Sequence, residues 1–247
     1  KAFQLIVKGL KGGHSGMDII LGRANANKIM NTLLLILTEK YNARVADIQG
    51  GSLRNAIPRE SFATVTVPEK YADHFVAYIP EFEEVVMRQF AAVEPDMSIT
   101  VVPAEMPAKV IDNQTIANLI KVVAKYPNGV IAMSKDFEGT VETSSNLAIV
   151  KLIDGQIMIA SLQRSLVDAS KDELAAEMRK VLESCGARAE STGSYPGWKP
   201  NINSIIYNTM KKVYEEKYGK TPKTMVIHAG LECGILGSKY PNWDMVS

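Results

Sequence analysis

The chain begins with the stretch that decides its fold, which reads AFQLIVKGL at residues 2–10, KGGHSG at 11–16 and MDIILGRANANKIMNTLLLILTEKY at 17–41. The first part is rich in strand formers, and the glycines of the second part predict a turn. In the third part, apolar residues such as Ile29 and Leu33 recur at helical spacing. The stretch therefore predicts a strand, a glycine-rich turn and a long helix.

The residues that follow complete a known order of elements. Strand formers recur at 44–49 and 61–67, a helical pattern covers 69–93, and a further strand is expected at 97–102. The order strand, helix, strand, strand, helix, strand is the split βαβ arrangement of ferredoxin-like domains. It is an α+β fold with helices on one face of an antiparallel sheet, and by itself it assigns no function.

The second half of the chain allows the same sheet to be extended. From about residue 115 the pattern predicts a short helix, then two strands joined at Asp154 and Gly155. A helix at 171–184 and a strand at 187–191 follow.

Composition changes at residues 192–200, which concentrate glycine and proline and indicate a crossing between domains. We therefore predict one domain over residues 1–192 and an incomplete piece of an α/β domain over residues 193–247. In this piece we expect a helix at 203–218, a strand at 223–228, a glycine-rich turn and a final strand.

Charge and cysteine content exclude several classes of partner. The 28 basic and 27 acidic side chains leave a formal charge of +1, so no broad field would attract nucleic acid or an anionic membrane. Cys185 and Cys233 lie far apart, which fits a reduced, cytoplasmic setting.

Strand-like character runs up to both ends of the chain, and we therefore expect it to be an excerpt from a longer protein.

Three residues could bind a ligand, and for each a structural role remains open. His14 projects from a turn between glycines and could donate a hydrogen bond to a developing oxyanion, although a plain turn would look the same. Asn55 either caps its own turn or binds a substrate carboxylate or carbonyl. Arg164 is either an exposed strand end or a two-pronged carboxylate clamp.

A further motif, HAGLECG at residues 228–234, follows a predicted strand. Glycine-rich turns at strand ends are common ligand positions in open α/β sheets, so Gly230 and Glu232 are candidate substrate contacts. The three histidines form no H-E-x-x-H pattern, and we expect no metal site within this chain. His74 is interpreted as a surface residue of a helix.

Taken together, GGHSG, GGSLRNAIP, the strand end at Arg164 and HAGLECG follow one another as in the aminoacyl-histidine dipeptidases, also called Xaa-His dipeptidases or peptidase D. The chain resembles that family over essentially its whole length. The family belongs to a two-zinc exopeptidase superfamily that includes peptidase T and aminoacylase.

This resemblance implies a split αβ lid domain at residues 1–192 and a return to the catalytic domain afterwards. His14 resembles the lid histidine that binds the scissile carbonyl, in many relatives across a homodimer. Asn55 and Arg164 resemble the residues that hold the backbone and terminal carboxylate of a dipeptide. Gly230 and Glu232 match a loop at the substrate pocket.

The same resemblance implies that the ligands of two zinc ions, and the general base, lie upstream of Lys1 and shortly after Ser247. This chain alone is therefore expected to hold no zinc and to be inactive. The alternative is a split βαβ module without catalysis, serving dimerisation or regulation by a small ligand.

Overall fold

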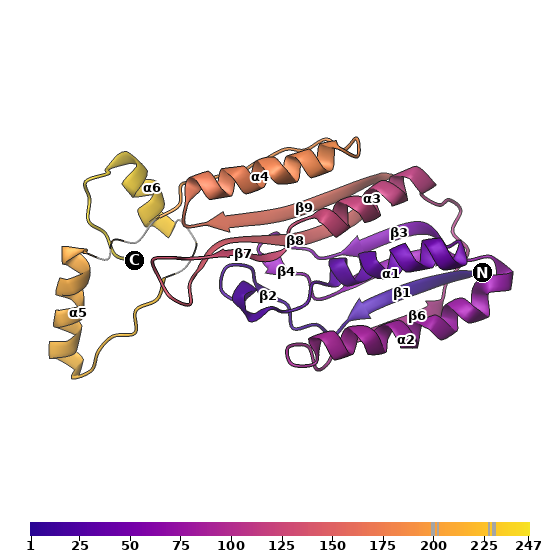
Figure 1. The fold of residues 1–247 in the computed structure, drawn as a ribbon, viewed down its shortest axis with the longest axis horizontal. Coiled ribbons are helices and arrows are strands. Elements are labelled where there is room, and N and C mark those ends of the chain that lie inside the picture. The colour runs from indigo at the N-terminus through magenta and orange to yellow at the C-terminus, as the bar shows by residue number, and fades with distance from the viewer. Residues whose placement is uncertain (199–200, 202, 227, 229–230) are drawn as a thin grey trace.

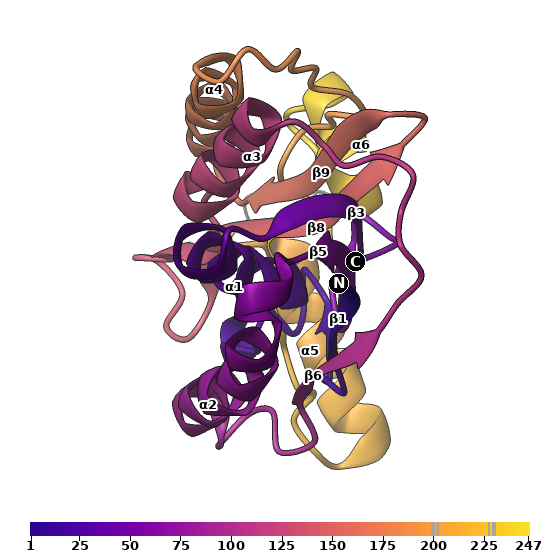
Figure 2. The same ribbon diagram turned by 90° about the vertical axis from the view of Figure 1, so that its right-hand side faces the viewer.

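The computed structural model describes every residue except 199–200, 202, 227 and 229–230. Its first half is the predicted split βαβ unit, in which the strand order β6-β1-β5-β3 is antiparallel throughout. Its elements in chain order are β1 (Ala2–Lys8), α1 (Ala26–Tyr41), β3 (Arg44–Gly50), β5 (Ser61–Thr66), α2 (Ala72–Phe90) and β6 (Ser98–Pro103). All but β5 are labelled in Figure 1, and β5 is labelled in Figure 2. A single turn of 3-10 helix, η2 (Glu69–Tyr71), leads into α2.

The second half extends the same sheet, as the sequence allowed. The long strand β8 (Val141–Ile153) pairs antiparallel with β3, β7 (Gly129–Met133) and β9 (Gln156–Ser165). Two more helices, α3 (Asn113–Lys125) and α4 (Asp168–Glu183), join α1 and α2 on one face of the sheet (Figure 2).

The core lies between that helical face and the sheet. Leu5 of β1, Leu33 of α1, Val65 of β5 and Phe75 of α2 are all completely buried. The rings of Phe3 and Phe75 pack 5.1 Å apart between centroids. This contact network fixes the strands whose ends carry the candidate site.

Helix α1 begins nine residues later than the sequence pattern predicted. Residues 17–25 contain one signal that ends a helix and one that begins a helix. Gly22, in the left-handed conformation with φ 64°, ends a short 3-10 helix, η1 (Ile19–Leu21). Asn25 then caps α1 by accepting hydrogen bonds from the backbone nitrogens of Asn27 and Lys28. The residues before Asn25 therefore remain a folded loop that carries His14.

Two very short strands, which the sequence analysis missed, join this loop to the loop between β3 and β5. Strand β2 (Gly13–His14) pairs antiparallel with β4 (Ala56–Ile57), and His14 lies opposite Ala56. The two glycine-rich loops are therefore held side by side at one end of the sheet (Figure 1).

The C-terminal segment differs from its prediction. The expected helix is α5 (Ile205–Tyr218), but residues 187–191 and the described part of 223–228 form no strand. A strand needs a neighbour for its backbone hydrogen bonds, and the described residues offer these segments none. The expected final strand is also wrong, because Leu231–Lys239 forms helix α6.

None of the helices in the described part of the chain is both long and apolar enough to cross a membrane.

Candidate functional site

Ser15 is the residue through which the three predicted site residues meet. It is buried, with 1% of its surface exposed, and it directly follows His14. Its backbone nitrogen donates to the carbonyl oxygen of Asn55 at 2.8 Å, and its Oγ accepts from Arg164 Nε at 3.4 Å. Residues 14, 55 and 164, far apart in sequence, therefore lie at one place in the fold.

Gly16 allows His14 and Arg164 to approach each other. A Cβ atom at this position would lie 3.0 Å from His14 Cε1 and 3.3 Å from Arg164 Nε. A side chain there would press against both groups, so glycine keeps the space between the imidazole and the guanidinium narrow.

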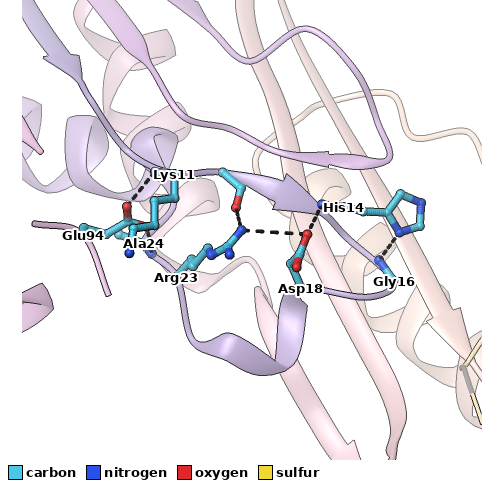
Figure 3. A network of polar contacts seen from close by, with 8 residues as sticks. Lys11, His14, Gly16, Asp18, Arg23, Ala24 and Glu94 are labelled. Carbon is cyan, nitrogen blue, oxygen red and sulfur yellow. Dashed lines mark hydrogen bonds and ion pairs between the residues drawn. The ribbon is translucent and has the colours of Figure 1, made fainter. Parts of the chain in front are cut away.

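The loop around His14 is anchored by charged side chains (Figure 3). Asp18 Oδ2 accepts from the backbone nitrogen of His14 at 2.8 Å and forms an ion pair with Arg23 at 3.8 Å. Arg23 also donates to the carbonyl oxygen of Gly12 at 2.6 Å. The buried carboxylate of Glu94 accepts from the backbone nitrogens of Lys11 and Ala24, which ties the two ends of the loop together.

The orientation of the His14 ring follows from one hydrogen bond. The backbone nitrogen of Gly16 donates to His14 Nδ1 at 3.2 Å, so Nδ1 acts as an acceptor (Figure 3). In a neutral imidazole the proton then resides on Nε2. Because the His14 side chain is exposed, this arrangement leaves an N–H donor available to a ligand.

Arg164 is the second-last residue of strand β9, where it lies opposite Ser144 of β8. Its side chain is half-buried, yet among the described residues no carboxylate forms an ion pair with it. A guanidinium offers five N–H donors in a fork that matches a carboxylate. Most of these donors therefore remain available to an anionic group.

His228 joins this cluster, although the sequence analysis treated it only as the start of a motif. Its ring is buried, and Nε2 shares a hydrogen bond of 2.7 Å with Ser144 Oγ. Burial first, and then the positive charges of Arg164 and His14, lower its pKa from 6.5 to about 4. His228 is therefore neutral at pH 7. At that pH the positive charge next to it is the guanidinium of Arg164.

This lowered pKa predicts a pH-dependent stability. As the pH falls from about 6.5 towards 4, the unfolded chain binds the His228 proton before the folded protein does, so folding is weakened in that range and unaffected above it. We expect the midpoint of thermal unfolding to fall less between pH 7 and pH 5 in His228→Asn than in the unchanged protein. The exposed His74→Asn variant is the control, and equal falls in all three would contradict the assignment.

The other two predicted site residues are placed less directly. Gly230 lies outside the described residues. Glu232 is exposed in the first turn of α6, and no hydrogen bond between described residues connects it to His14, Asn55 or Arg164. Helix α6 lies against residue 196, since a Cβ on Gly234 would lie 2.6 Å from the Pro196 carbonyl oxygen. The next residue, Gly197, lies beside the end of β9, since a Cβ on it would lie 3.2 Å from the Ser165 carbonyl oxygen.

The described residues contain no group of three or more His, Cys, Asp and Glu side chains that could hold a metal ion. They therefore do not fit a zinc site by themselves.

Comparison with known proteins shows that the chain is similar to peptidases. Residues 5–94 match the peptidase dimerisation domain family. The whole chain is 37% identical to the cytosol non-specific dipeptidase of Escherichia coli K12, and it covers 51% of that protein.

A solved structure gives the same result. The crystal structure of aminoacylhistidine dipeptidase from Vibrio alginolyticus superposes on 99% of this chain with a TM-score of 0.92 and 39% identity. This chain covers 50% of that protein. It therefore spans about half the length of the relatives that it matches.

Proposed function

The chain shares its fold and much of its sequence, over its whole length, with the aminoacyl-histidine dipeptidases, and on this premise we propose that it is the substrate-binding half of a dipeptidase. The observation that carries the proposal is Arg164, a half-buried guanidinium without a carboxylate partner among the described residues, beside the imidazole of His14. Such a pair suits a short peptide, which presents a terminal carboxylate and a carbonyl oxygen.

Each group then has one task. Arg164 pairs with the terminal carboxylate of the dipeptide through two parallel hydrogen bonds. The amide of Asn55, in the neighbouring loop, binds the substrate backbone. His14 donates from Nε2 to the scissile carbonyl oxygen as negative charge develops on it, which is the role of an oxyanion donor. Gly230 and Glu232 would contribute from the C-terminal segment.

Hydrolysis also needs an activated water. In the complete enzyme we propose two zinc ions, which would supply that water and polarise the carbonyl group. Their ligands would come from sequence beyond this chain, because its described residues form no such group. The residues of this chain bind and orient the peptide and stabilise the charge on its oxygen.

The proposed parent protein is a cytoplasmic homodimer. Residues 1–192 would form its lid and 193–247 a part of its catalytic domain. The matched dimerisation domain supports the homodimer, and the name of the Escherichia coli relative supports the location. Because His14, Asn55 and Arg164 meet at Ser15 within one chain, they would serve one cleft as a unit, whichever subunit holds the metal.

The first test compares the chain with its parent. We expect the chain alone to retain less than one zinc ion per molecule and to release no histidine from β-alanyl-histidine, whereas the intact parent should do both. Metal analysis of the purified proteins and an assay of histidine release measure the two properties. Clear turnover by the chain alone would overturn the proposed division of labour, and a parent without peptidase activity would favour a non-catalytic module.

A further inference from the structure

Strand β8 has a gap along the edge that faces β3 and β7. It pairs with β7 up to Ser145 and with β3 only at Val150 and Lys151. In the gap, asparagine side chains make the hydrogen bonds that a neighbouring strand would otherwise make. Asn25 donates to the Leu147 carbonyl oxygen and Asn27 to that of Ala148. These amides satisfy backbone groups of β8 that burial would otherwise leave unpaired.

Asn146 lies in the same gap but serves a different segment. Its Nδ2 donates to the carbonyl oxygens of Arg54 at 3.0 Å and of Ala56 at 2.8 Å, the residues on either side of Asn55. Both protons of the amide are therefore used on the loop and none on β8. The residue is 1% exposed, and its Oδ1 has no partner in the described part of the chain.

The two bonds that Nδ2 donates to carbonyl oxygens set the orientation of the Asn146 amide. Turning the amide over would place Oδ1 against two carbonyl oxygens, so the observed orientation is fixed by its partners. Leaving a buried acceptor unpaired costs stability, and this cost accompanies the two bonds to the loop.

Loop 51–57 is also held from the other side, where the Ser15 nitrogen donates to the Asn55 carbonyl oxygen. The carbonyl groups of three consecutive residues, 54, 55 and 56, therefore accept hydrogen bonds from two donor residues, Asn146 and Ser15. Hydrogen bonds therefore hold the backbone on both sides of Asn55, while its side chain remains exposed.

We infer that Asn146 is a positioning residue, which aims the exposed Asn55 amide at the substrate by clamping the peptide groups on both sides of it. The inference rests on the proposed function, because it assumes that Asn55 binds the dipeptide. It adds a residue that makes no substrate contact itself and acts from a strand of the second half of the sheet.

The test uses the intact parent enzyme and the variant Asn146→Asp, which keeps the size of the side chain and removes both donors. Because misplacement of a binding group by about 1 Å costs up to about 100-fold, we expect KM for a dipeptide to rise on the order of tenfold and kcat to change less. The matched control is Asn31→Asp, a buried asparagine that donates to the Ile120 carbonyl oxygen of α3 and forms no hydrogen bond with the loop among the described residues. It should lower the melting temperature and leave KM unchanged.

A double-mutant cycle separates positioning from general damage. In an Asn55→Ala background, Asn146→Asp should raise KM by less than about twofold further, because the group that it aims is gone. Full additivity of the two effects would overturn the inference. So would an Asn55→Ala enzyme with an unchanged KM, because Asn146 would then have no group to act through.

A second measurement does not depend on activity. Hydrogen exchange of a peptide spanning residues 51–57 should become faster in Asn146→Asp and stay unchanged in Asn31→Asp. Unchanged exchange in both would overturn the clamp even in an active dipeptidase. Faster exchange in a protein that hydrolyses no dipeptide would retain the clamp and reject only the proposed function.

Discussion

We expect the Arg164→Ala variant of the intact enzyme to show a KM for dipeptides about 100-fold higher, with a much smaller change in kcat. Removing one partner of a close charge pair typically costs ~2–5 kcal/mol, and ~1.4 kcal/mol corresponds to a factor of ten. The substrate carboxylate would lose its two-pronged partner before and during the reaction alike, which is why KM carries the effect. Steady-state kinetics with β-alanyl-histidine measures both constants.

Two further variants sharpen this result. Arg164→Lys keeps the charge without the planar fork, so its KM should lie between those of the wild type and the alanine variant. Arg88→Ala removes an exposed arginine whose ion pair with Glu84 lies within helix α2, and it should leave both constants unchanged. An unchanged KM in Arg164→Ala would remove Arg164 from the substrate site.

The His14→Ala variant should behave in the opposite way, with kcat reduced by about 10²–10³ and KM nearly unchanged. The Nε2 donor is expected to bind the carbonyl oxygen most strongly when that oxygen carries negative charge, so its loss raises the barrier without weakening substrate binding. The same kinetic assay measures the effect. His74→Ala, in which an exposed histidine of α2 is removed, is the matched control.

The kinetic effect of His14→Ala separates two possible roles of this residue. If His14→Ala raises KM and leaves kcat intact, His14 is a ground-state binding residue and the oxyanion role is wrong.

The sequence predicted the split βαβ unit well because local and long-range signals agree there. Strand formers at 2–10, 44–49 and 61–67 correspond to β1, β3 and β5. The resemblance to the aminoacyl-histidine dipeptidases is confirmed. The start of α1 was missed, because the apolar pattern of residues 17–25 continues the helical spacing while Gly22 and Asn25 interrupt it.

The C-terminal segment was harder to predict for a physical reason. Residues 223–228 are rich in strand formers, but strand propensity is realised only against a neighbouring strand, and the described residues provide none. The segment 187–191 reads Ala-Arg-Ala-Glu-Ser, so it lacks strand formers as well as a neighbouring strand among the described residues. Propensity therefore identified the segment 223–228 and could not supply its partner.

Within the candidate site, the residues proposed to contact a ligand could be singled out from the sequence, whereas those that hold them could not. His14, Asn55 and Arg164 lie in motifs with glycines or at a strand end. The sequence around Ser144 and Asn146 offers one signal, a run of four polar residues at 143–146 before an apolar stretch, and the structure buries that run. Their partners at Arg54, Ala56 and His228 depend on tertiary contacts that no local pattern encodes.

The distances along the chain within the Ser15 cluster have a consequence for how the protein assembles. Asn55 reaches Ser15 across 40 positions, whereas Arg164 reaches it across 149. Closing a longer loop costs more entropy. The Arg164–Ser15 contact should therefore form after the Ser15–Asn55 contact between the two glycine-rich loops, and it should open first. If Arg164 and His14 act as proposed, partial unfolding of the β8–β9 hairpin would release the carboxylate end of a bound peptide first, while His14 stays in place.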